Sequence, residues 1–115
     1  MNNIVVTGGS GRFGVNLKRL NYKYKFPNKR ELNILSISSI ERYLKKHKIK
    51  TLIHLAGFSR PMAQHEKNIS KSIKLNIIGT CNVVIACQKF NVKIIYFSSS
   101  YVYPGIKGNY KETDS

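Results

Sequence analysis

The chain has 115 residues, 42% of them hydrophobic, which suits one small globular domain. Its 20 lysines and arginines outnumber 5 aspartates and glutamates, for a formal net charge of +15. The apolar runs are far shorter than the ~20 residues that a membrane-spanning helix needs, and the sequence has neither an internal repeat nor a low-complexity segment. Membrane-spanning and repeat architectures are therefore excluded.

The start of the chain and its cysteines indicate a compartment. MNNIVVTGGS enters a strand pattern directly, without the basic and apolar regions of a secretory signal. Cys81 and Cys87 lie in a helical stretch, about 9 Å apart along its axis, which is too far for a disulfide. No ligands accompany them at metal spacing. We expect a cytoplasmic protein with two buried, reduced thiols and no metal site.

The positive charge admits three interpretations: solvated surface charge, an anionic small-molecule ligand, or nucleic acid. The lysines are scattered rather than clustered, and the chain is also rich in Asn and Ile, a bias that needs no function. The sequence lacks the aromatic patterns on which bases stack. Solvated charge is therefore favoured over an anionic ligand, and we expect no nucleic-acid and no membrane partner.

Short strands and helices alternate along the chain. Apolar or alternating runs predict strands at 3–9, 21–26, 31–37, 50–57 and 92–100. Helical spacing predicts helices at 12–20, 38–49 and 65–90. This alternation is typical of βαβ units. We predict an α/β, Rossmann-type doubly wound parallel sheet of about five strands in the order 3-2-1-4-5, covered on both faces.

The apolar positions within the helices predict their buried faces. In the first helix the stripe is Phe13, Leu17 and Leu20. In the second, Ser38 or Ser39 is the expected N-cap, and the apolar face is Ile40, Tyr43 and Leu44. In the long third helix, Gly79 predicts close packing against a neighbour, and the residues at spacings of three and four are Ile69, Ile73, Ile77, Thr80, Val84 and Cys87.

A glycine loop, TGGSGRFG at 7–14, follows the first strand and opens the first helix. Gly8 permits a tight turn, Gly11 lets a pyrophosphate approach the backbone, and Gly14 lets the helix lie close to the strand. The amides at the helix start then face an anion. Arg12 and Phe13, at this helix start, are further candidates for cofactor contact. The context favours a dinucleotide site over a plain turn.

The second strand favours one dinucleotide over the other. An NAD site usually has an acid at the end of this strand, but the sequence there is FPNKREL, with Glu31 as the only nearby acid. Lys29 and Arg30 suit a 2′-phosphate instead, unless they are merely solvated surface cations. We expect NADP, with NAD as the alternative.

Four segments together resemble one enzyme family. They are TGGSGRFG, HLAG at 54–57, NIIGTCNVV at 76–84 and FSSSYVYPG at 97–105. In order and spacing they resemble the extended short-chain dehydrogenase/reductases, the NAD(P)-dependent epimerases, dehydratases and reductases of nucleotide sugars. The last segment is most similar to dTDP-4-dehydrorhamnose reductases, and KRELNIL is also similar to GDP-fucose synthases. The resemblance covers essentially the whole chain and implies a nucleotide-sugar substrate.

The resemblance implies further cofactor contacts. Asn33 and Ile34 match the pair that lies along the adenine, although many relatives carry Asp where this chain has Asn33. Ala56 and Gly57 match the small residues that let the cofactor riboses pass. Asn76 matches an asparagine of the long helix, where we favour an amide that satisfies backbone groups over a catalytic role.

The resemblance also implies a catalytic hydroxyl. Ser99 matches the residue that hydrogen-bonds the substrate oxygen, with Ser98 and Ser100 as competitors. The proton donor of the family is a tyrosine four residues before a lysine on one helix face. The only such spacing here is Tyr103 to Lys107, and Pro104 and Gly105 argue against a helix between them.

The expected picture is an N-terminal NAD(P)-binding Rossmann domain at 1–115 whose Tyr/Lys pair and substrate domain lie beyond it. In that case the sheet is incomplete at its C-terminal side, the strand at 92–97 is an apolar edge, and the isolated chain is inactive and prone to form a homodimer. The alternative is a non-catalytic NAD(P)-binding module that is complete at this length.

Overall fold

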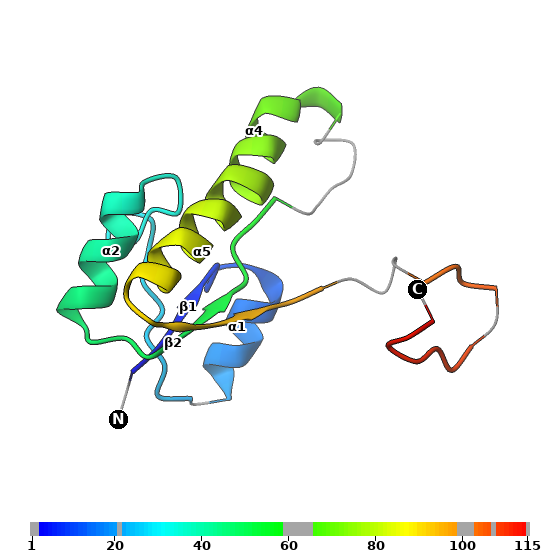
Figure 1. Ribbon diagram of the computed structural model, residues 1–115, viewed down its shortest axis with the longest axis horizontal. Helices are drawn as coiled ribbons and strands as arrows, with labels where there is room; N and C mark the ends of the chain where they lie inside the picture. The colour runs from blue at the N-terminus through cyan, green and yellow to red at the C-terminus, as the bar shows by residue number, and fades with distance from the viewer. Residues whose placement is uncertain (1–2, 21, 59–65, 99–102, 107, 115) are drawn as a thin grey trace.

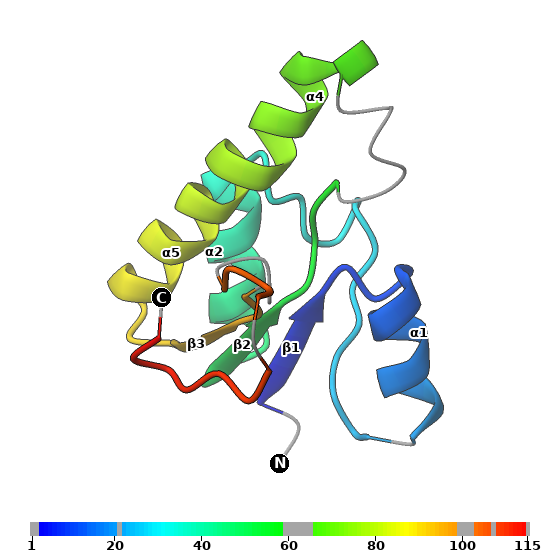
Figure 2. The same cartoon turned by 90° about the vertical axis from the view of Figure 1, so that its right-hand side faces the viewer.

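A computed structural model describes residues 3–20, 22–58, 66–98, 103–106 and 108–114. Three parallel strands, β1 (Ile4–Thr7), β2 (Thr51–His54) and β3 (Lys93–Tyr96), form one sheet in the order β1-β2-β3. Figures 1 and 2 show α1 on one side of this sheet and α2 with α5 on the other. The predicted α/β class with a parallel sheet is confirmed, and the strand order agrees in the part that is present.

The predicted second strand is reduced to a single bridge. Lys25 pairs in parallel with Val5, through Val6 N–H to Lys25 O at 2.8 Å and Lys25 N–H to Ile4 O at 2.9 Å. Its place beside β1 is the predicted one. The third strand, predicted at 31–37, is wrong, because this segment forms turns. Asn28 and Asn33 accept backbone N–H groups in these turns, and such local bonds compete with strand pairing.

The first two helices differ from expectation in detail. In helix α1 (Arg12–Arg19) Gly14 is the buried residue. The predicted apolar stripe is largely wrong, because Phe13 and Leu20 are exposed and Leu17 is only half-buried. Helix α2 (Ile37–Lys46) is capped by Ser36 rather than Ser38 or Ser39, because the Ser36 hydroxyl accepts from Ser39 N–H at 3.3 Å. Its predicted buried face of Ile40, Tyr43 and Leu44 is confirmed.

The long helix has three parts: α4 (Ile69–Ile73), a π-helical turn η1 (Lys74–Ile78) and α5 (Gly79–Lys89). The predicted face is largely wrong, because Ile69, Ile73, Ile77 and Val84 are exposed. The residues of α5 that are buried are Gly79, Val83, Ala86 and Cys87. The predicted close packing at Gly79 is confirmed, since a Cβ there would lie 2.7 Å from Ile34 Cδ1.

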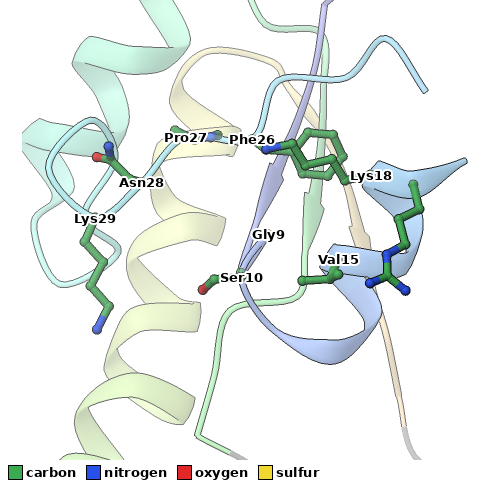
Figure 3. A pocket seen from close by; sticks show the side chains of 10 residues that line it. Gly9, Ser10, Val15, Lys18, Phe26, Pro27, Asn28 and Lys29 are labelled. Carbon is green, nitrogen blue, oxygen red and sulfur yellow. The ribbon is translucent and has the colours of Figure 1, made fainter. Parts of the chain in front are cut away.

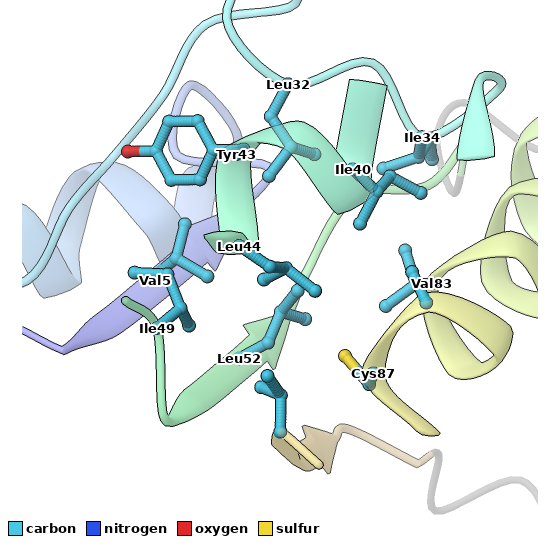
Figure 4. Packing of buried hydrophobic residues seen from close by; sticks show 12 residues of the cluster. Val5, Leu32, Ile34, Ile40, Tyr43, Leu44, Ile49, Leu52, Val83 and Cys87 are labelled. Carbon is cyan, nitrogen blue, oxygen red and sulfur yellow. The ribbon is translucent and has the colours of Figure 1, made fainter. Parts of the chain in front are cut away.

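The core lies between the sheet and the α2–α5 layer. Side chains of β1, β2, α2 and α5 point toward one another there (Figure 4). Strand alternation sends Val5 and Leu52 to this face and Val6 and Ile53 to the α1 face. The cluster consists of Val5, Leu32, Ile34, Ile40, Tyr43, Leu44, Ile49, Leu52, Val83, Ala86, Cys87 and Val92.

The other side of the molecule is less covered. In the sheet formed by the described residues, β3 is an edge strand, as predicted, with Ile95, Tyr96 and Phe97 exposed.

Cys87 is buried and free, as predicted, whereas Cys81 is free but exposed. No helix within the described ranges is long and apolar enough to cross a membrane.

Candidate functional site: a dinucleotide cleft at the carboxyl edge of the sheet

The glycine loop brings three backbone segments into close approach. Gly8 has φ +75°, a left-handed conformation that favours glycine, and a Cβ at Gly8 would lie 2.6 Å from the Ala56 nitrogen. A Cβ at Gly14 would lie 2.5 Å from Gly8 O and 2.6 Å from Gly9 Cα. The loop therefore packs against the end of β2 and the start of α1 only because these positions lack side chains.

The start of α1 leaves backbone donors for an anion. Gly11 is the N-cap, and within the described residues no side chain caps this end of the helix. Gly11 N–H donates to Gly8 O at 3.0 Å, and Val15 N–H donates to Gly11 O at 2.9 Å. The first turn contains no acid. The amides of the first turn, with the positive end of the helix dipole, suit a phosphate group.

A cleft of 280 Å³ begins at this loop and crosses the ends of β1 and β2. Its lining combines residues of the glycine loop with polar and apolar side chains. Its lining includes six of the predicted cofactor residues: Gly8, Gly11, Lys29, Ile34, Ala56 and Gly57. Thr7, Ser10, Pro27, Asn28, Leu32, Leu55 and Leu75 complete it. Backbone amides at a helix start beside an apolar slot suit an adenine dinucleotide.

Other predicted cofactor residues lie elsewhere. Arg12 and Arg30 line neither this cleft nor the two other pockets described below. Asn33 holds its turn, with Oδ1 accepting from Leu35 N–H at 3.0 Å and its own N–H donating to Ser39 Oγ at 2.9 Å. Phe13 packs edge-on against Phe97, with ring centroids 4.9 Å apart.

A second pocket of 510 Å³ opens between the ends of β2 and β3. Phe13 lines it from α1, Asn76 and Thr80 from the long helix, and Tyr96 and Phe97 from the sheet edge. The 280 Å³ cleft and this pocket share Leu55, Ala56 and Gly57. A ligand bound in the cleft can therefore continue past these small residues into the second pocket.

Asn76 acts on the backbone, as predicted. Its Oδ1 accepts from Phe58 N–H at 2.7 Å and its Nδ2 donates to Phe58 O at 2.8 Å. The Asn76 side chain also occupies the space beside Gly57, where a Cβ would lie 2.9 Å from Oδ1. The amide thus fixes the segment that joins the two pockets.

His54 is a buried polar residue of the site that the motif analysis did not single out. Thr7 Oγ1 accepts from the N–H groups of Leu55 and Ala56, both at 3.2 Å, so its hydroxyl proton is directed to His54 Nδ1 at 2.8 Å. His54 Nε2 then donates to Thr80 Oγ1 at 3.1 Å. Burial lowers the pKa of His54, which favours this neutral tautomer.

The parallel register could have revealed this contact. Thr7 and His54 are paired across β1 and β2, and His54 and Tyr96 across β2 and β3. Side chains paired in this way lie on the same face of a sheet. A polar residue at each strand end, in runs that are otherwise apolar, is the signal that these side chains meet.

The predicted catalytic residue Ser99 lies outside the described residues, as do Ser100 and Lys107. Tyr103 stacks on Tyr110, with ring centroids 5.0 Å apart. Gly105 has φ +75°, and the described residues from 103 onward contain no helix. These observations agree with the prediction that Tyr103 does not share a helix face with Lys107.

A parallel sheet with a glycine loop, a helix start and an apolar slot at its carboxyl edge defines the class of Rossmann-type dinucleotide-binding proteins. Within that class, the family model of the RmlD substrate binding domain matches residues 1–115. The chain belongs to this family.

Two curated relatives agree with this assignment. A GDP-L-colitose synthase of Yersinia pseudotuberculosis is 31% identical over 106 residues, which cover 88% of this chain and 34% of the relative. A dTDP-4-dehydrorhamnose reductase of Aggregatibacter actinomycetemcomitans is 28% identical over 120 residues, covering 99% and 40%. The chain thus spans well under half the length of these relatives.

A similar solved structure carries a dinucleotide. The crystal structure of dTDP-4-dehydrorhamnose reductase from Bacillus anthracis, in complex with NADP, matches with a TM-score of 0.78 and 28% identity. The match covers 90% of this chain and 38% of that one. Its fold agrees with the α/β arrangement described above.

Proposed function

We propose that this chain is the NADP-binding part of a nucleotide-sugar reductase. The observation that carries the proposal is the glycine loop beside an apolar cleft, where a Cβ at Gly8 or Gly14 would lie only 2.5–2.6 Å from backbone atoms. Family membership and the similarity to an NADP-bound reductase support the same activity. NAD is the alternative cofactor.

The residues of the cleft would divide the work of binding. The first-turn amides of α1 would hold the pyrophosphate, and Ile34 and Leu75, which both line the cleft, would contact the adenine. Ala56 and Gly57 would let the cofactor pass into the 510 Å³ pocket, toward Phe13 and the end of β3.

When bound, the cofactor supplies a hydride for a sugar carbon. The chain's own contribution at that carbon would come from Ser99, whose hydroxyl would hydrogen-bond the substrate oxygen. Its competitors are Ser98 and Ser100. The packed rings of Phe13 and Phe97 would provide an apolar contact on one side of the pocket.

Equilibrium binding tests the proposal. Titration of the full chain with NADPH, followed by the nicotinamide fluorescence, should give saturable binding. Gly14→Ala should abolish it, because a Cβ there clashes with Gly8 O and Gly9 Cα. Gly108→Ala is the matched control, since nothing lies within 4 Å of a Cβ at that position. Absence of binding by the unmodified chain to both NADPH and NADH would refute the proposal.

Turnover is a separate question. The sequence has no Tyr-x-x-x-Lys other than Tyr103 to Lys107. We therefore expect the 115-residue chain to bind NADPH without oxidising it in the presence of a 4-keto nucleotide sugar. Turnover above background would contradict this expectation and would leave the binding proposal intact.

A further inference from the structure

The buried hydrogen bonds of His54 end on the backbone that joins the cleft to the 510 Å³ pocket. His54 and Thr7 are each 2% exposed. Thr7 Oγ1 accepts from the N–H groups of Leu55 and Ala56 at 3.2 Å and lies 2.8 Å from His54 Nδ1. Leu55 and Ala56 line both cavities. A buried titratable ring is therefore connected, through one hydroxyl group, to the lining of both.

The Thr7 hydroxyl has no spare capacity for hydrogen bonds. A hydroxyl oxygen has two lone pairs and carries one proton. The two backbone N–H groups occupy the lone pairs of Thr7 Oγ1, and its proton is directed to the unprotonated Nδ1 of His54. On the other side of the ring, His54 Nε2 donates to Thr80 Oγ1 at 3.1 Å. Every group in this chain has a partner only while His54 is neutral.

Protonation of His54 would bring one donor too many to Thr7 Oγ1. Nδ1 would then carry a hydrogen directed at the same oxygen, so three N–H donors would compete for two lone pairs. An imidazolium N–H is the strongest donor of the three, because it is charged. One of the backbone N–H groups, of Leu55 or of Ala56, would therefore be displaced. In either case the backbone at 55–56 loses one of its two hydrogen bonds to the Thr7 side chain.

The surroundings of the ring offer no charge that would stabilise an imidazolium. Among the described residues, the groups that face the ring are Thr7 from β1, Thr80 from α5 and Tyr96 from β3. Tyr96, whose ring centroid lies 5.9 Å from that of His54, is the titratable one of these. Tyrosines do not ionise in the pH range of histidine. Burial accordingly lowers the pKa of His54.

A shift of the backbone at 55–56 would reach the glycine loop. Gly8 lies so close to this backbone that a Cβ on it would be 2.6 Å from the Ala56 nitrogen. Gly8 lines the cleft and also a third pocket, of 520 Å³, between α1 and residues 26–29. Figure 3 shows the third pocket, with Ser10 of the loop at its wall. The hydroxyl of Thr7 thus holds a segment that contacts the loop shared by both cavities.

We propose that neutral His54 is a positioning residue for the dinucleotide, and that protonation of its ring weakens cofactor binding. This inference rests on the proposed function and adds to it a dependence of affinity on pH. The affinity is complete while His54 is neutral and is lost as the pH falls through the pKa of His54 in the free chain. Because linkage is reciprocal, a bound dinucleotide lowers that pKa further.

Calorimetric titration of the full chain with NADP at pH 7.5 and pH 5.5 tests the proposal. The oxidised form is used because the reduced nicotinamide is unstable in acid. Between the two pH values, the dissociation constant of the unmodified chain should rise about tenfold more than that of His54→Gln, which has no titratable ring. The 2′-phosphate of NADP also titrates at about pH 6, but this contribution is common to both chains. Circular dichroism establishes the lowest pH at which each chain is folded, and the comparison ends there.

Two substitutions at Thr7 give an independent measurement. Thr7→Val has nearly the same shape but no hydroxyl, so it should weaken NADP binding about tenfold at pH 7.5. It should also remove the pH dependence, because His54 and the backbone then share no acceptor. Thr7→Ser restores the hydroxyl and should restore the pH dependence. His47→Gln is the control for loss of a histidine far from the cleft, and it should leave the pH dependence as it is.

The outcomes separate this proposal from the proposed function. If the unmodified chain binds NADP at pH 7.5, and its affinity falls no more than that of His54→Gln at low pH, the role of His54 is refuted and the proposed function stands. If Thr7→Val keeps the pH dependence, the coupling does not pass through the hydroxyl and the proposal is equally wrong. If the unmodified chain binds neither NADP nor NAD at pH 7.5, both proposals fail.

Discussion

Ile40 and Ile77 are the same residue type, each in a helical segment with an apolar pattern, and they have opposite environments. Ile40 is 0% exposed in the core between the sheet and the α2–α5 layer, which we call the packed side. Ile77 is 57% exposed on the outer face of α4 and η1. We call this face, together with β3 and the described residues after it, the open side.

The difference shows that helical spacing alone does not identify a buried face. On the long helix, the inward positions include Gly79, which packs on Ile34, and Asn76, which binds the Phe58 backbone, besides the apolar Val83. The stripe of Ile69, Ile73 and Ile77 is offset from Asn76 by one residue, which is about 100° around the helix axis. The segments packed against the helix determine which of its faces is buried. Here they offer the backbone of Phe58 and the side chain of Ile34.

The largest expected effect compares the two isoleucines. Ile40→Ala removes buried methyl groups and leaves a cavity, so we expect a loss of about 3 kcal/mol in the free energy of unfolding. Ile77→Ala should change it by less than about 0.5 kcal/mol. Urea denaturation of both variants measures this, and equal losses would mean that the open side is packed in solution.

Two glycines give the next comparison. Gly14→Ala places a Cβ against the backbone of Gly8 and Gly9, and we expect a cost of about 2 kcal/mol. Gly108→Ala meets open space and should be nearly neutral. Thermal melts of the two variants check the difference, and an unchanged Gly14→Ala melt would show that the glycine loop is looser than described.

The pH dependence of stability compares two histidines. Burial lowers the pKa of His54 below its ordinary value of 6.5, so the unfolded chain takes up a proton first as pH falls. The contribution of His54 to the free energy of unfolding is complete above pH 6.5 and is lost as the pH falls through the folded-state pKa. The loss amounts to at most about 1.4 kcal/mol per pH unit. His54→Gln should flatten this slope.

His47, at the end of α2, is the matched site. Burial and the charges of Lys25 and Lys46 lower the pKa of His47, while Glu31 opposes them. This ring is only partly buried and, among the described residues, closes no comparable hydrogen-bond chain, so His47→Gln should flatten the slope less than His54→Gln. Stability measured between pH 7.5 and 5 distinguishes them, and a larger effect at His47 would contradict the role given to His54.

The smallest expected effect concerns the reactivity of the two cysteine thiols and leaves the free energy of unfolding unchanged. Burial raises the pKa of Cys87 to about 11, so only about 10⁻³ of this thiol is ionised at pH 8. Cys81 is exposed. A thiol-specific disulfide reagent should modify Cys81 in the native chain and Cys87 only after unfolding. Equal rates would indicate that the packed side opens readily.

The strands were predictable where apolar residues run continuously. IVVT, TLIH and KIIY became β1, β2 and β3 in the expected order. The segment at 31–37 was wrongly predicted as a strand. Leu32 and Ile34 are buried, but they lie in turns that Asn28 and Asn33 stabilise through their side-chain oxygens. An apolar side chain can reach the core from a turn as well as from a strand.

The sequence predicted the part of the candidate site that requires glycine, where a side chain would clash with neighbouring backbone. Gly8 and Gly11 line the cleft, and the close approaches at Gly8 and Gly14 follow from their spacing. The histidine between Thr7 and Thr80 was missed because it depends on strand register and on a helix that is distant in sequence. Arg12 lines none of the three pockets and stays a prediction, because charge near a loop does not specify the direction of a side chain.

The π-helical turn η1 implies an unusual response to deletion. A π turn accommodates one residue more than an α-helical turn, so removing one residue from 74–78 would leave a segment able to close as an uninterrupted α-helix. Because about five residues of a π turn cover nearly the same rotation around the axis as about four residues of an α-helix, the α4 segment would then keep its orientation relative to α5. The isoleucine stripe would stay on the open side. The helix should therefore tolerate loss of one residue here, provided that Asn76, which binds the Phe58 backbone, is retained.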